Sequence, residues 1–427
     1  MTSNALVKHI GVGQGIALYV SAILGAGVLV LPGQAASMAG PASLVSWAIA
    51  GLLGIPLASM FAALARRYPD AGGIASYAKA GFGPRVGGVT GWLFFVAGSV
   101  GQTIVPLTGG YYVADALGMG TATSFVVAAL ILAAATVMNL LGVRVSARAQ
   151  LLLAGAVAAA LAITIVLTVP RMSTAHLTPF APHGITPIGS AVIVLFFAFA
   201  GWEAISHLAG EFQDADRDVP RAVAATIVIV TVLYLGTACA VVLTGTYGRP
   251  STDRVAVGIL LRDALGPAAT SIAAVIAVVI SLGTTNAFIA GVSRLAGSLA
   301  ADHWLPTPVA GITRDGVPVG GILAVSGTAT AGLVLAAWRG WGTDTLVVVP
   351  STLVVAVYVV AAASAIRILT GWGRAAGLMT FAVTVAVVPT ALQHALIPVI
   401  VVLMALLSQR LCRPPMTQPT IKDSTHA

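Results

Sequence analysis

Long apolar runs, separated by short polar connections, follow one another along nearly the whole chain. A helix needs about 20 apolar residues to cross a bilayer, and runs near this length recur. They predict about twelve membrane-spanning helices, roughly at residues 13–37, 42–65, 86–117, 122–141, 149–170, 187–212, 221–246, 267–299, 318–338, 344–368, 374–391 and 394–411. No connection is long enough for a soluble domain. The pattern therefore predicts an all-α, polytopic membrane protein with a single domain over residues 1–427.

The two ends of the chain carry less apolar character. The first run follows a segment without a small-residue cleavage site, so we expect a retained helix and not a signal peptide. Residues 412–427 are polar and contain proline, so we expect a disordered tail.

Two of the predicted spans are interrupted near their centres. The first contains Gly25-Ala26-Gly27, and the sixth contains Gly201 followed by Glu203. Glycine costs a helix interior about 1 kcal/mol relative to alanine, and lipid offers no water to the freed backbone groups. The spans lie five apart and so run in opposite directions, which is typical of an inverted repeat with a substrate site at the midplane. The alternative is that the glycines only allow close helix packing.

Composition and charge agree with a membrane protein. Hydrophobic residues make up 58% of the 427 positions and charged residues 8%. The basic residues that give the net charge of +8 occur singly between apolar runs, so we expect no nucleic-acid partner. Two cysteines, Cys239 and Cys412, do not form a disulfide framework.

The arrangement of Lys and Arg predicts the orientation. Alternate connections starting from the N-terminus hold sixteen of the twenty-one basic residues, and the opposite connections hold five. Cytoplasmic loops are enriched in Lys and Arg. We therefore expect both termini in the cytoplasm of a bacterial cell, with the protein in the plasma (inner) membrane.

Three motifs occur in order along the chain. They are Ile23-Leu24-Gly25-Ala26-Gly27-Val28 with Pro32, Tyr68-Pro69-Asp70-Ala71-Gly72-Gly73 in a loop, and Phe199-Ala200-Gly201-Trp202-Glu203 followed by Glu211. Together they resemble the amino acid–polyamine–organocation superfamily of transporters, over nearly the whole chain. The segment Gly201–Phe212 is most similar to the bacterial branch that exports methionine and branched-chain amino acids.

The resemblance implies a LeuT-like fold. Its five-plus-five inverted repeat would place repeat one at about 13–170 and repeat two at about 187–368, with discontinuous helices 1 and 6. Two additional helices would follow at about 374–411.

The resemblance also implies a substrate site between spans one, three, six and eight. Backbone N–H groups of the first break would hold the substrate carboxylate, carbonyls of both breaks its ammonium, and aromatic side chains would gate the pocket. The implied residues are Ser21, Ala22, Ile23, Gly25, Ala26, Gly27, Val28, Phe197, Ala198, Ala200, Gly201, Trp202 and Phe288, with Ser99 and Gln102 as polar candidates on span three. The chain departs from relatives at Ala26, where many have a hydroxyl, and in lacking a lysine on span five.

Glu203 has three interpretations. It carries protons, since an intramembrane acid is functional by default; it bonds the unwound backbone; or it pairs with a substrate cation. His207, one turn later, shares a proton with it or is an ordinary polar group. A candidate sodium site is formed by the hydroxyls of Ser281, Thr284 and Thr285 together with Asn286. No acid accompanies them, and Ser and Thr commonly bond their own helix backbone, so H⁺ is preferred over Na⁺ as the coupling ion.

The preferred function is secondary transport of neutral hydrophobic amino acids, namely methionine, leucine, isoleucine and valine. We expect export by alternating access. The alternative is a proton-coupled importer or antiporter of other amino acids or polyamines. A membrane enzyme is disfavoured because no paired acids, HExxH motif or Ser/His/Asp set lies at membrane depth. A channel is disfavoured because no polar or charged rings recur. No cofactor is expected.

Overall fold

The computed structural model describes residues 11–68, 73–142, 147–199, 201–203, 212–313 and 316–412. Within these residues the regular structure is helical. The α-helices are α1 Val12–Ile23, α2 Gly27–Ala39, α3 Ser43–Arg67, α4 Ile74–Phe82, α5 Pro84–Ala116, α6 Thr121–Leu140, α7 Ala147–Thr168, α8 Thr186–Leu195, α10 Ala215–Thr244, α11 Pro250–Asp253, α12 Ala256–Leu265, α13 Ala268–Ala301, α14 Val319–Arg339, α15 Thr343–Leu346, α16 Val348–Ile368, α17 Gly371–Val387 and α18 Leu396–Cys412. Short 3₁₀ helices are η1 Gly40–Ala42, η2 Val169–Arg171, η3 Thr174–Leu177, η5 Thr307–Ala310 and η6 Val388–His394.

In the described part of the chain, ten helical stretches are long and apolar enough to cross a membrane. One of them, Gly27–Arg67, joins α2, η1 and α3, which the sequence divides between two spans. The apolar helices α1 and α8 are shorter, with 12 and 10 residues, and they belong to the two spans predicted to be interrupted. The protein is thus a multi-pass membrane protein, and the count of twelve spans stays a prediction.

Helix ends follow the local sequence. The carboxylate of Asp214 caps α10 by accepting a hydrogen bond from the Arg217 amide at 3.2 Å. The same helix ends at Gly245, whose φ of 67° lies in the left-handed region that glycine adopts without strain. α10 is therefore a 30-residue helix, long enough to cross a bilayer.

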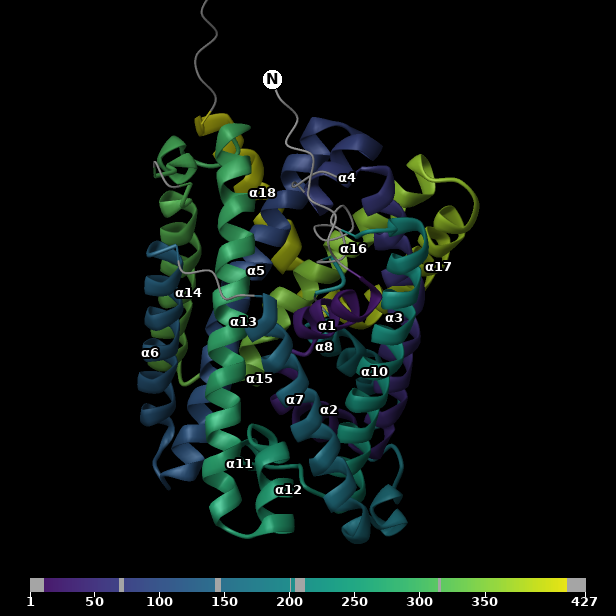
Figure 1. Ribbon diagram of the computed structural model, residues 1–427, viewed down its shortest axis with the longest axis vertical. Helices are drawn as coiled ribbons and strands as arrows, with labels where there is room; N and C mark the ends of the chain where they lie inside the picture. Colours follow the sequence, from purple (N-terminus) through teal and green to yellow (C-terminus); the bar gives the residue numbers. More distant parts are fainter. Residues whose placement is uncertain are drawn as a thin grey trace, which may run out of the picture.

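The two short helices lie in the interior of the bundle. α1 packs against α10 and α7, α2 against α8 and α10, and α8 against α3 and α16. Figure 1 shows α1 and α8 near mid-height, with α6 and α14 on one flank and α17 on the other. The long helices α5 and α13 pack along each other and complete the enclosure of the interrupted segments.

Candidate functional site

The two interruptions touch each other at the centre of the bundle. α1 ends at Ile23 and α2 begins at Gly27, and α8 ends at Leu195 before a series of turns that includes Gly201. Gly201 has a φ of 135°, a conformation that side-chain-bearing residues rarely adopt. A Cβ at Gly201 would lie 2.6 Å from the Ala22 carbonyl oxygen. Only glycine lets the second break approach the end of α1 this closely.

Tyr234 of α10 bridges the two breaks. Its hydroxyl oxygen lies 2.7 Å from the Ile23 carbonyl oxygen and 3.1 Å from the Ala198 carbonyl oxygen. The ring packs against Trp47 and Phe199, with centroids 5.4 and 5.3 Å away. Buried tyrosine hydroxyls usually have a hydrogen-bond partner, and here unwound carbonyls of both broken spans provide it.

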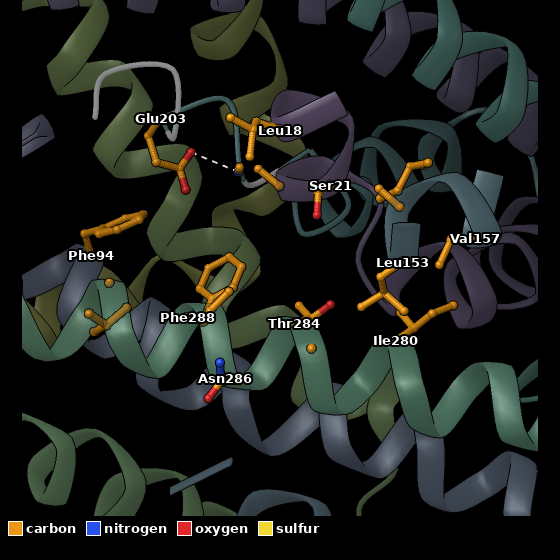
Figure 2. A pocket seen from close by; sticks show the side chains of 18 residues that line it. Leu18, Ser21, Phe94, Leu153, Val157, Glu203, Ile280, Thr284, Asn286 and Phe288 are labelled. Carbon is orange, nitrogen blue, oxygen red and sulfur yellow. Dashed lines mark hydrogen bonds between the residues drawn. The ribbon is translucent and has the colours of Figure 1, made fainter. Parts of the chain in front are cut away.

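Glu203 bonds the backbone of its own break. Its Oε2 atom accepts a hydrogen bond of 3.0 Å from the Gly201 amide (Figure 2). It also accepts one of 2.9 Å from the Tyr358 hydroxyl of α16. The residue is 6% exposed. These contacts support the interpretation of Glu203 as a carboxylate that satisfies freed N–H groups, while proton carriage stays a prediction.

Backbone groups of the first break remain free to bind a ligand. Within the described residues, the amides of Ala26 and Gly27 donate no hydrogen bond, and the carbonyls of Ser21 and Ala22 accept none. The amides begin α2, where the helix dipole favours an anion, and the carbonyls end α1, where it favours a cation. The carbonyls of Ile23 and Ala198, also predicted to bind an ammonium, are instead occupied by Tyr234.

A small cavity of about 40 Å³ lies at the breaks. Its volume holds only one or a few water molecules, so an amino acid would require the walls to move apart. Apart from Gln102 and Thr284, its walls are apolar or backbone, and they consist of Ala22, Ile23, Gly25, Ala26, Gly27, Phe94, Ala97, Gly98, Gly101, Gln102, Val105, Phe197, Ala198, Thr284, Phe288, Pro350 and Val354.

A larger cavity of about 270 Å³ adjoins it, close to the lower limit for small-molecule sites. Phe94, Phe288, Ala22 and Thr284 line both cavities, so they form the boundary between them. Figure 2 shows Phe288 and Thr284 on α13, facing the space beneath Ser21. The larger cavity is lined by Leu18, Ser21, Ala22, Leu24, Phe94, Leu153, Ala154, Val157, Gly201, Glu203, Ile280, Gly283, Thr284, Asn286, Ala287, Phe288, Gly291 and Val292.

Most residues predicted for the site lie at one of these cavities, but not all. Val28 and Trp202 line neither cavity. Val28 is fully buried. The Trp202 ring packs on Gly54 of α3, where an added Cβ would lie 3.4 Å from the ring. Trp202 therefore packs against α3, and its role in substrate binding stays a prediction. Two further predicted residues, Ala200 and His207, lie outside the described residues.

Polar candidates on the long helices divide in the same way. Gln102 and Thr284 reach the small cavity, whereas Ser99, Ser281 and Thr285 line neither cavity. The hydroxyls of these three serine and threonine residues are buried without a hydrogen-bond partner in the described part of the chain. No cluster of three or more His, Cys, Asp and Glu residues that could hold a metal ion occurs among the described residues.

Sequence reasoning missed three aromatic residues of the site. Phe94 of α5 forms the cavity boundary opposite Phe288, and Tyr234 and Tyr358 bond the unwound segments. A tyrosine within an otherwise apolar span was the available signal, because its hydroxyl requires a partner inside the membrane.

Comparison with known proteins identifies the family. A model of the amino acid permease family matches residues 10–419. The chain belongs to the amino acid permease family. This permease is 31% identical over 371 residues to an uncharacterized amino acid permease, YecA, of Bacillus subtilis, covering 85% of this chain and 87% of the relative. It is 29% identical over 380 residues to the L-methionine/branched-chain amino acid exporter YjeH of Escherichia coli, covering 86% and 88%.

A third relative is more distant. The serine/threonine exchanger SteT of Bacillus subtilis is 26% identical over 239 residues, covering 54% of each chain. The relatives are named as transporters and permeases, so this permease is assigned to amino acid transport. The resemblance drawn from the three sequence motifs is thereby confirmed.

Proposed function

We propose that this permease is a secondary transporter that exports neutral amino acids with bulky apolar side chains by alternating access. It would reside in a bacterial inner membrane with twelve spans, a five-plus-five inverted repeat and both termini in the cytoplasm. The observation that carries the proposal is the meeting of two broken helices at a cavity with free amides and free carbonyls. The similarity to the L-methionine/branched-chain amino acid exporter of Escherichia coli supports the direction and the substrate class.

The backbone groups suit the part that all amino acids share. The amides of Ala26 and Gly27 would bind the carboxylate, and the carbonyls of Ser21 and Ala22 would bind the ammonium. The side chain would then extend toward the apolar wall formed by Val105, among others. Each methylene buried there stabilises the complex by about 0.8 kcal/mol.

Charged side chains would find no partner at the small cavity. Its lining contains no Asp, Glu, Lys, Arg or His among the described residues. Placing an unpaired charge at this depth costs at least about 2 kcal/mol. The carboxylate of Glu203, which reaches only the larger cavity, is engaged by Gly201 and Tyr358.

The function is tested by counterflow of labelled leucine in proteoliposomes with a panel of competing amino acids. We expect saturable exchange, with methionine, leucine and isoleucine competing at least tenfold better than glycine, arginine or glutamate, since three methylenes amount to about 2.4 kcal/mol. Chemical conversion of the label would indicate an enzyme, and flux without saturation a channel. If arginine or a polyamine competes best, Glu203 binds the substrate and the alternative function holds.

Tyr234→Phe is expected to slow exchange about fivefold, because it releases the unwound carbonyls that the hydroxyl holds together. A net hydrogen bond contributes about 1 kcal/mol, which corresponds to this factor. Tyr19→Phe is the matched control, since the buried Tyr19 hydroxyl has no partner among the described residues. Exchange rates of both variants would be compared at equal amounts of folded protein. Equal rates for the two would remove Tyr234 from the site.

A further inference from the structure

The half-helix α2 is held at the end opposite its free amides. Gln34 is 5% exposed, and its Nε2 atom donates a hydrogen bond of 2.7 Å to Thr343 Oγ1. Thr343 is fully buried and begins α15, which leads directly into α16. The Gln34 side chain thus joins the helix that would bind the carboxylate to the segment before α16.

A second set of contacts joins α11 to the same region. Gly33 packs on the backbone of Asp253, where an added Cβ would lie 2.8 Å from the Asp253 Cα atom. The next residue, Arg254, lies 3.3 Å from Asp344 Oδ1 through Nη2, and its guanidinium lies 4.9 Å from the centroid of the Tyr111 ring. Four elements, α2, α5, α11 and α15, therefore meet at this point.

The meeting point is incompletely satisfied. Gln34 Oε1 and Arg254 Nε are buried and have no hydrogen-bond partner among the described residues. Buried polar groups are normally paired, and each unpaired one destabilises the arrangement that buries it. Water would satisfy these atoms if the elements separated. The closed state is held by a few polar contacts, and opening would hydrate its unpaired groups. Both properties are expected of a closure that opens and closes reversibly.

The contacts at α11 lie apart from both cavities. α11 and α12 lie at the lower end of Figure 1, and α12 is followed directly by α13, which rises from there. The larger cavity follows α13 from Ile280 to Val292, whereas the small cavity meets α13 at Thr284 and Phe288. The contacts that join α2, α11 and α15 lie at the α11 end, and their residues line neither of these two cavities.

We propose that the Gln34–Thr343 hydrogen bond and the Arg254–Asp344 ion pair form a latch that closes the substrate site toward the α11 end. This inference rests on the proposed transport function. The latch residues position α2 and α11 without touching the substrate. Releasing the latch shifts the population toward a conformer open at the α11 end, and apparent affinity on each side follows the fraction of protein open to that side.

The test measures the KM for leucine exchange separately from each side, in right-side-out and inside-out vesicles. Gln34→Met keeps the side-chain length and removes the donor, and Asp344→Asn removes one charge of the pair. Both variants are expected to lower KM on the α11 side and raise it on the other, changing the ratio of the two KM values about fivefold for Gln34→Met. Asp344→Asn should have a smaller effect, because Asp344 is 54% exposed.

Arg262→Gln is the matched control. It removes a charge from an ion pair of 3.4 Å with Asp263 that does not join two elements, and it should leave the ratio unchanged. An unchanged ratio in both latch variants, or equal changes on both sides, overturns the latch while leaving transport intact. If the wild-type protein exchanges no amino acid, the proposed function fails and the latch with it. If Gln34→Met does not fold, the Asp344→Asn ratio decides.

Discussion

Gly201→Ala is expected to abolish amino acid exchange. The added Cβ would lie 2.6 Å from the Ala22 carbonyl oxygen and 3.3 Å from the Ile23 Cα atom. The alanine residue would also have to adopt a φ of 135°. Backbone on both sides resists the shift, so the two breaks must separate. Separation displaces the Ala22 carbonyl proposed for the ammonium and lengthens the Tyr234 bridge. Exchange of labelled leucine and the elution profile of the purified protein measure the loss of transport and the retention of fold.

Gly27 offers the matched control within the other break. An added Cβ there would lie 3.4 Å from the nearest side-chain atom, of Leu31, and 3.6 Å from the Ala198 Cα atom, which are ordinary contacts. Gly27→Ala should therefore keep most of the exchange activity, whereas Gly27→Leu should fill the carboxylate site and abolish it. A well-folded Gly201→Ala protein with wild-type exchange would show that the contact between the breaks is not needed for transport.

The positions of the breaks were predictable because glycine weakens a helix at its own position within an apolar stretch. Gly25 and Gly27 weaken the helix where the structure ends α1 and begins α2, and Gly201 lies in the turns after α8. The approximate positions of the long apolar helices were also predictable, because a span requires about 20 apolar residues, although the stretch Gly27–Arg67 joins what the sequence divides between two spans. These features depend on residues close together in sequence, so hydropathy and glycine positions are sufficient to place them.

The partners of the broken segments were not predictable in this way. Tyr234 is 211 positions from Ile23, and Tyr358 is 155 positions from Glu203. Each tyrosine contributes a single hydroxyl within an apolar span, and the hydrophobic pattern of that span does not indicate the partner of the hydroxyl. Trp202 shows the opposite difficulty: an aromatic residue beside Gly201 is equally suited to a pocket wall and to core packing, and the neighbouring Gly54 provides space for its ring in α3.

Substitutions at Glu203 are expected to separate its structural role from proton coupling. Its Oε2 atom accepts two hydrogen bonds, from the Gly201 amide and the Tyr358 hydroxyl. Glutamine keeps an acceptor oxygen of the same reach, so Glu203→Gln should retain fold and exchange. Leucine leaves the Gly201 amide buried and unpaired, at about 1–3 kcal/mol, and leaves the Tyr358 hydroxyl only the Phe199 carbonyl oxygen at 3.4 Å. Glu203→Leu should therefore lower the midpoint of thermal unfolding and lose exchange together.

The response to a pH gradient then distinguishes the two roles of Glu203. If the carboxylate carries protons, Glu203→Gln should exchange leucine at the wild-type rate while losing the acceleration that a pH gradient gives, because an amide does not titrate. If Glu203 only supports the unwound backbone, the glutamine variant should respond to the gradient as the wild-type protein does. Tyr358→Phe removes one of the two donors and is expected to lie between wild type and Glu203→Leu in thermal stability. A Glu203→Leu protein with unchanged stability and exchange would show that the carboxylate does not hold the break.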